Sequence, residues 1–460
     1  MSTIIPGVSV TVNTFPVAPN VSGNGGTVGF VGDFVLGPIN EVITINSSSE
    51  INTKLGGLTK ADARALYAIL LQKPKALKVV RVVGSAAEYA SKALLGAASA
   101  ASLTLTAKYK GTYGNSITVA VASGVLTLVY GSTTETFSFT TLDGLVDLIN
   151  ATSTLVTAAK DGAVVPADIS ATAFTLGADG TVNDAAYVGG FDSGSDTRTG
   201  LSLFETDADV DIVTIGGTPS STKNTALMAH CESLNRIASV PIIASTLSGA
   251  ISEAAGYITA NGQNATMYPN PKFSINGTIY TINGGIVYAG VAGRIDPHRS
   301  TANQFVFGCI GVDRGLTAAE IEQLIVAYVN PLTLKGTGYA VRHGLMLSTT
   351  TDWRQIGVRR VFNIIARDLD EILDTFVGEP NGQDLWRKVV TACDGYLSGL
   401  RRADWIEDFR NICDASINTA EVVSAGRLLA QSYVKPRYIA HYIEVELNKV
   451  ITITVEEQTV

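Results

Sequence analysis

An alternation of strand-like and helix-like segments occurs twice in this chain of 460 residues and constrains its fold most strongly. The first series has a strand at 27–31, a helix at 60–72 and a strand at 77–83. The second series has three strands and two helices, at 210–215, 222–237, 240–244, 249–259 and 265–268. Strands that alternate with helices pair in parallel beneath a cover of helices, so both series predict an α/β domain.

The stretch between the two series has a different composition. It is rich in Thr, Ser, Gly and Val, with short alternating runs such as Ile117, Val119 and Val121, and it ends in a segment rich in Gly and Asp. Such runs are typical of half-buried antiparallel strands. We therefore predict a β-rich domain of the β-sandwich type at residues 91–194. It is inserted into a discontinuous α/β domain built from 21–90 and 195–345.

The pattern becomes helical after Trp353. Apolar residues recur every three or four positions, at Val358, Phe362, Ile365, Leu369, Ile372 and Phe376. A second stretch, 385–400, has the same periodicity, which is typical of helices with one buried face. We assign residues 346–442 to a C-terminal α+β domain.

Both ends of the chain carry alternating apolar residues. The N-terminal segment, 1–20, has Val8, Val10 and Val12 and no charged residue, whereas disordered tails are usually polar and charged. The C-terminal segment, 443–460, has apolar side chains at odd positions only: Ile443, Val445, Leu447, Ile451, Ile453 and Val455. We predict two extended strand arms that link copies of the chain, although a flexible tail is the simpler alternative for the N-terminus.

The composition favours an assembled protein. Only 16% of the residues are charged and the mean hydropathy is +0.25, so a free monomer would expose much apolar surface. A net charge of -8 without a long run of one sign gives no indication of a nucleic-acid partner. We expect neither a signal peptide nor insertion into a membrane, and the four dispersed cysteines fit reduced, buried thiols.

A search for chemistry finds no convincing site. The glycines from Gly23 to Gly32 precede and run through the first strand instead of forming a phosphate-binding turn before a helix. The four histidines are far apart in the sequence and have no ligand spacing. A triad of His230, Asp211 and a distant serine stays open, because triads are defined by geometry. We predict no enzymatic activity, no cofactor and no metal.

One charge pattern suggests a partner surface. Four arginines, Arg354, Arg359, Arg360 and Arg367, precede a group of acidic residues along the predicted helix, which opposes the helix dipole. Local ion pairs, such as Arg367 with Asp370 or Glu371, are one interpretation. The other, given equal weight, is that the arginines face an acidic partner.

Several segments together resemble contractile tail sheath proteins. The best match is Asp352-Trp353-Arg354 with Val358-Arg359-Arg360, followed by Glu379-Pro380-Asn381. Weaker matches occur in order along nearly the whole chain, among them Ile5-Pro6-Gly7-Val8, Tyr113-Gly114-Asn115-Ser116 and Val434-Lys435-Pro436. The chain departs from the family pattern at 401–405, where a small, Gly-containing turn is expected.

The resemblance implies a structural subunit of a sheath that surrounds an inner tube and contracts to eject it, delivering a genome or effectors. It implies a subtilisin-like α/β domain without a working triad, and arms that join neighbours by strand exchange. The implied partners are other copies of the chain, the inner tail tube, and baseplate and tail terminator proteins. The implied location is a virion tail or tail-like particle assembled in the host cytoplasm. An oligomeric α/β enzyme with an unrecognised site, or a pilus or adhesin subunit, are the alternatives.

Overall fold

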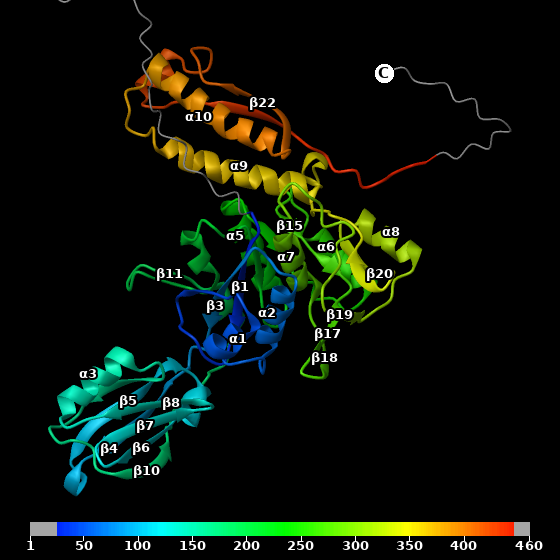
Figure 1. The fold of residues 1–460 in the computed structure, drawn as a ribbon. Coiled ribbons are helices and arrows are strands. Elements are labelled where there is room, and N and C mark those ends of the chain that lie inside the picture. Colours follow the sequence, from blue (N-terminus) through cyan, green and yellow to red (C-terminus); the bar gives the residue numbers. More distant parts are fainter. Residues whose placement is uncertain (1–24, 446–460) are drawn as a thin grey trace, which may run out of the picture.

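The computed structural model describes residues 25–445, and its centre is a six-stranded sheet with the order β15-β14-β13-β1-β3-β2 (Figure 1). Every pair is parallel except β2 with β3 at one edge. The strands are β1 (Thr27–Asp33), β2 (Val42–Thr44), β3 (Ala76–Val82), β13 (Ile212–Ile215), β14 (Ile237–Ser239) and β15 (Asn264–Ala265). The predicted α/β architecture is therefore confirmed.

Helices cover both faces of this sheet. Val28 and Phe30 of β1 belong to one buried cluster, with α2 and α7, whereas Val31 belongs to a second cluster on the other face, with α5 and α6. The alternation follows from the two-residue period of a strand. The helices are α1 (Ser48–Leu55), α2 (Ala61–Leu71), α5 (Ser221–Ser233), α6 (Leu247–Ala255) and α7 (Gly284–Arg294).

Several predicted boundaries in this domain were wrong; helix α6, for example, ends at Ala255 instead of residue 259. Helix α5 ends at Ser233 instead of residue 237, because Asn235 has a positive φ of 51° that a right-handed helix cannot continue through. The next strand, β14, consequently begins at Ile237, three residues before the predicted 240–244. It ends just before Pro241, which has no N–H to donate to a sheet.

Two three-stranded sheets adjoin the central sheet, with the orders β16-β20-β21 and β18-β17-β19. Their elements are β16 (Met267–Tyr268), β17 (Pro271–Ile275), β18 (Thr278–Thr281), β19 (Cys309–Val312), α8 (Ala318–Val326), β20 (Asn330–Lys335) and β21 (Gly338–Val341).

The β-rich region contains two sheets, β4-β5-β9 and β10-β6-β7-β8, whose side chains share one buried cluster with helix α3. Its elements are β4 (Tyr89–Leu95), β5 (Ala101–Lys110), β6 (Thr118–Ala122), β7 (Val125–Tyr130), β8 (Thr133–Ser138), α3 (Leu142–Thr152), β9 (Val156–Lys160) and β10 (Ile169–Ala173). A short helix and a hairpin lead back to the central sheet: α4 (Asp184–Val188), β11 (Gly190–Asp192) and β12 (Thr197–Thr199).

The C-terminal region lies at the opposite end of the molecule from the β-rich region, with the central sheet between them (Figure 1). It contains the two predicted helices and a hairpin: α9 (Ile356–Asp374), α10 (Gln383–Arg402), β22 (Ile406–Ile412), α11 (Ala420–Ser424) and β23 (Gln431–Pro436). The turn at 401–405, after α10, lacks the glycine that the family pattern leads one to expect. Asp404 has a φ of 67°, so it takes the left-handed conformation for which a glycine would otherwise be used.

Candidate subunit interface in the C-terminal region

The described part of the C-terminal region, up to residue 445, contains two small apolar clusters. In the first, Val361 and Ile365 of α9 pack with Leu397 of α10 and Ile406 of β22. The second is centred on Leu385, Val389 and Cys393 of α10, with Cys413. Ile365 and Leu369 of the predicted apolar stripe thus help to hold the helices and the hairpin together, along with Val361, which the stripe did not include.

The hairpin β22–β23 is a two-stranded sheet with two open edges. Phe409 pairs with Val434, and both contribute to the apolar cluster beneath the hairpin. Among residues 25–445 each of these strands has one neighbour only. The outer edge of each strand therefore presents unpaired N–H and C=O groups, which form a template for another strand. A two-stranded sheet is marginally stable alone and gains from such additions.

Two arginines fix α9 on the central domain. Arg360 is 2% exposed, and its guanidinium donates to the carbonyl oxygens of Gly25 (2.7 Å) and Ile295 (3.2 Å). Burial lowers the pKa of Arg360 to about 10. Arg367 forms an ion pair with Asp211 at 2.8 Å. Although burial acts to lower it, the pKa of Arg367 is raised overall, because Asp211 stabilises the charged form.

The other two arginines lie closer to the surface. Arg359 stacks over Trp353, 4.7 Å from the ring centroid, and donates to Asn363 at 2.9 Å. Arg354 stacks over Tyr328 at 4.6 Å. The hypothesis that the four arginines face an acidic partner stays a prediction. The suggested local pairs of Arg367 with Asp370 or Glu371 are not formed. Arg367 contacts Asp211 of the central domain at 2.8 Å and Asp368, the next residue of its own helix, at 3.9 Å.

The start of the described chain is locked beside α9. The N–H groups of Gly26 and Thr27 both donate to Asp211, at 2.7 and 3.1 Å, so one carboxylate holds the chain and Arg367 together. Gly25 has no room for a side chain, since a Cβ there would lie 2.4 Å from Ile364. The described chain therefore begins at a fixed point.

The predicted arm residues are mostly beyond the described range. Val8, Val10, Val12, Leu447, Ile451, Ile453 and Val455 lie outside the described residues. Ile443 and Val445 are 85% and 80% exposed, in a segment without assigned secondary structure. Both apolar side chains are exposed and available to pack against another surface.

The triad left open by the sequence is not formed by its two named members. His230 lies 3.2 Å from Arg236 and not against a carboxylate, while Asp211 is occupied by Arg367 and two backbone N–H groups. Burial, with the charge of Arg236, lowers the pKa of His230 to about 4.

Within residues 25–445 no group of three or more His, Cys, Asp or Glu side chains is placed to bind a metal. None of the helices in that range has the length and hydrophobicity needed to cross a bilayer.

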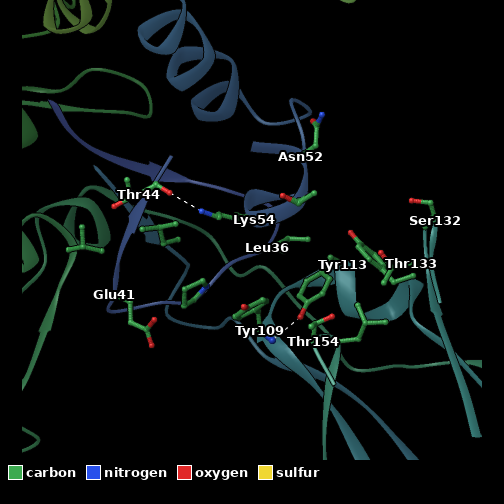
Figure 2. Close-up of a pocket in the computed structure, with 17 residues that line it drawn as sticks. Leu36, Glu41, Thr44, Asn52, Lys54, Tyr109, Tyr113, Ser132, Thr133 and Thr154 are labelled. Carbon is green, nitrogen blue, oxygen red and sulfur yellow. Dashed lines mark hydrogen bonds between the residues drawn. The ribbon is translucent and has the colours of Figure 1, made fainter. Parts of the chain in front are cut away.

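A cleft of about 700 Å³ separates the β-rich region from the central domain. Figure 2 shows Tyr109, Tyr113 and Thr154 on one wall, facing Lys54 and Thr44 on the other. One wall is held to the other by a buried arginine. The guanidinium of Arg81 donates to the carbonyl oxygens of Phe34, Val35, Gly37 and Lys110. The lining has no histidine or cysteine and no pair of carboxylates, so its chemistry does not favour catalysis.

Comparisons with known proteins point to one family. Residues 348–448 match the phage tail sheath C-terminal domain, a range that contains α9, α10 and the hairpin. The tail sheath protein of Vibrio phage KVP40 is 28% identical over 150 residues, 31% of this chain and 22% of that protein. The tail sheath protein of Enterobacteria phage T4 is 28% identical over 138 residues, 30% of this chain and 21% of that protein. This chain thus spans about a fifth of the length of these curated relatives.

Solved structures agree over a much longer range. The sheath tail protein from Desulfitobacterium hafniense superposes with a TM-score of 0.64 at 19% identity, covering 89% of this chain and 94% of that one. The sheath of the extracellular contractile injection system PVC, in its contracted state, gives 0.60 at 15% identity, covering 98% and 99%. Residues 348–448 are thus similar to the phage tail sheath C-terminal domain, and the chain has the fold of sheath proteins. The resemblance identified in the sequence is confirmed.

Proposed function

We propose that this protein is the structural subunit of a contractile tail sheath, which polymerises around an inner tube and drives its ejection by passing from an extended to a contracted arrangement. The observation that carries the proposal is the β22–β23 hairpin. It has two open edges, and it lies inside the range that matches the sheath C-terminal domain. The chain also has two terminal segments with the alternation of strands.

Strand addition explains how such a polymer holds together while it moves. Arms from two neighbouring copies add to the open edges of the hairpin, one arm at each edge. The main-chain hydrogen bonds hold the strands, and the alternating side chains fix the register. The arms Val8–Val12 and Ile443–Val455 act as tethers, so the subunit bodies exchange one packing for another without separating.

The finer parts of the proposal concern the body and its partners. The α/β domain is subtilisin-like and lacks a working triad, and the protein is not an enzyme. Contraction uses no nucleotide, since its free energy comes from new contacts between bodies. Baseplate and tail terminator proteins bind the ends of the polymer, and the particle is assembled in the host cytoplasm. Arg354 and Arg359 reach the molecular surface and face the acidic inner tube, whereas Arg360 and Arg367 act inside the subunit.

Electron microscopy of the purified full-length protein tests the proposal. Hollow striated tubes are the expected result. A variant without residues 1–14, or without 447–460, should remain a folded monomer and form no tubes. A wild-type protein that stays monomeric at all concentrations would count against the sheath role, and tubes formed by a truncated variant would exclude that arm as a linker.

A further inference from the structure

The segment that follows the hairpin, residues 437–442, lies on the surface of its own subunit. Gln355, just before α9, makes two hydrogen bonds with the backbone of Ile439: it accepts from the N–H at 2.9 Å and donates to the carbonyl at 3.2 Å. Ile439 and His441 are partly buried, whereas their neighbours Tyr438, Ala440 and Tyr442 are exposed. The segment therefore docks one face, with the alternation of an extended strand.

Two glycines shape the surface that receives it. A Cβ on Gly357 would lie 2.7 Å from the terminal methyl group of Ile439 and 2.9 Å from the carbonyl oxygen of His298. A Cβ on Gly344 would lie 2.1 Å from the hydroxyl of Ser300. That hydroxyl is 3.0 Å from Nε2 of His441. The hollow exists only because both positions lack a side chain.

A pair of histidines closes the contact. The ring centroids of His343, on the body, and His441, on the segment, are 4.2 Å apart. Nδ1 of His343 accepts the N–H of Gly344 at 2.9 Å, so in the neutral ring the proton is on Nε2, which lies 3.3 Å from the hydroxyl of Tyr442. A second proton would have to bind at Nδ1 and would break the bond to Gly344.

We propose that residues 437–442 form a clasp, which holds the root of the C-terminal arm on the body of its own subunit and which opens when the His343–His441 pair is protonated. The clasp fixes the point from which the arm leaves. Acidification frees that point, since two cationic rings in contact repel each other and one of them loses a backbone hydrogen bond. The clasp does not rest on the sheath function, because it is a contact within one chain.

Among residues 25–445, no acid contributes to the pKa shift of either histidine. Burial lowers the pKa of His343 to about 4, and the charge of His441 acts in the same direction. Burial alone lowers the pKa of His441. The other ionisable groups on the adjoining segments contribute to neither shift: Arg342 beside His343, Asp296, His298 and Arg299 in the loop before Ser300, and Tyr442 and Glu444 on the arm.

The sign of the pH dependence follows. The docked histidines have lowered pKa values, so the released state binds protons that the docked state excludes. The clasp is at full strength above pH 6.5, the ordinary value, and weakens as the pH falls towards about 4. Each histidine shifts the equilibrium by at most about tenfold per pH unit within that window.

Hydrogen–deuterium exchange of the full-length protein, corrected for intrinsic exchange rates, tests the clasp. The backbone amide of Ile439, which donates to Gln355, should lose protection by at least about tenfold between pH 7.5 and pH 5.0. Amides of β1 should stay protected at both values, which shows that the body remains folded. Unchanged protection of Ile439 would overturn the proposal.

Two variants complete the test. In the double variant His343→Asn with His441→Phe, the asparagine can still accept the N–H of Gly344 and neither side chain titrates, so protection should vary by less than about twofold over the same pH range. Acid release that persists in this variant would assign the switch to other groups and contradict the role of the pair. Gln355→Ala should lower the protection of the Ile439 amide at both pH values. High protection in this variant would show that the segment is not held as described.

Discussion

The two points at which the chain leaves the described subunit are built in opposite ways. At the N-terminal point, Gly25 and Gly26 are buried, and the backbone is held by the charged side chains of Asp211 and Arg360. At the C-terminal point, residues 437–442 lie half exposed on the surface. Arg437 forms a solvent-exposed ion pair with Asp404 at 2.7 Å, and the rest of the segment is held by neutral groups, chiefly Gln355 and the two histidines. The N-terminal exit is therefore part of the folded core. The C-terminal exit is a surface contact that can open without unfolding the domain.

The contrast suggests that the two arms have different roles in a polymer whose subunits are linked through their chain ends. An arm that leaves from a buried point transmits any movement of the body directly. An arm whose root can detach gains several residues of free length, at roughly 3.3 Å per residue in an extended chain. In a sheath that changes its packing, the buried N-terminal exit would transmit force between subunits, and the detachable C-terminal exit would let the linker lengthen. The following predictions, from the largest expected effect to the smallest, can break or sharpen this contrast.

Arg360→Glu should be the most damaging change. It places a carboxylate, in a site that is 2% exposed, against the carbonyl oxygens of Gly25 and Ile295. We expect a loss of about 3–5 kcal/mol in the free energy of unfolding, measured in urea. The matched control is Arg359→Glu on the next residue, which is only partly buried. It loses a hydrogen bond to Asn363 and stacking on Trp353 and brings a carboxylate near Glu232, so we expect about 1–2 kcal/mol. Equal effects of the two changes would show that the N-terminal exit is not held by Arg360.

Asp211→Asn should have an intermediate effect. The amide oxygen can still accept from Gly26 and Thr27, but the charge opposite Arg367 is lost, so we expect about 2 kcal/mol of destabilisation. Asp209→Asn serves as the control, since the carboxylate of Asp209 is 77% exposed and its pair with Lys78 should be worth less than about 1 kcal/mol. A stability unchanged by Asp211→Asn would place the anchor of this exit elsewhere.

Gly357→Ala should affect both the helix and the arm. The added methyl group meets Ile439 and the carbonyl of His298, and overpacking of this kind costs about 1–3 kcal/mol. Combining it with Ile439→Ala removes one of the two clashes. If the clasp is real, the combined variant should recover part of the lost stability, which thermal unfolding can measure. Additive losses would indicate that Ile439 does not occupy the hollow.

Gln355→Ala should have the smallest effect on stability. Its two hydrogen bonds join a surface segment, so the unfolding free energy of the body should change by less than about 0.5 kcal/mol. A large loss of stability would contradict the description of this exit as detachable.

The sequence predicts the body of the molecule better than its interfaces. The alternation of strand-like and helix-like segments predicted the central sheet. Each strand of a buried parallel sheet is followed by a covering helix, and this order is visible in the sequence. The hairpin β22–β23 was not assigned. A bulge between Ile406 and Asp408 breaks the two-residue period, so Ile406 and Phe409 pack in one cluster although they are three residues apart.

The histidine pair could not be found in the sequence either. His343 and His441 are almost a hundred positions apart, and neither lies in a recognisable motif. Their contact depends on how the end of the chain folds back over α9. In the same way, nothing in the pattern of arginines along α9 distinguished Arg360, which is buried against two carbonyl groups, from Arg359 next to it. Helical periodicity predicts on which face of the helix a residue lies, but not which residues of the rest of the protein it contacts.

The central claim is that an arm from one copy adds to the β22–β23 hairpin of another, and cysteine cross-linking between copies tests it most directly. Val8, Val10 and Val12 are replaced by cysteine one at a time, each together with Tyr433→Cys on the exposed face of β23. After assembly and mild oxidation, the account predicts a ladder of covalent oligomers on a denaturing gel for the pairing in register, and none for the single variants. The same series is made for the C-terminal arm, with Ile443, Ile451 and Ile453 replaced by cysteine one at a time together with Tyr433→Cys. Tubes that form normally but yield only monomers on the gel for every pairing of both series would contradict the central claim.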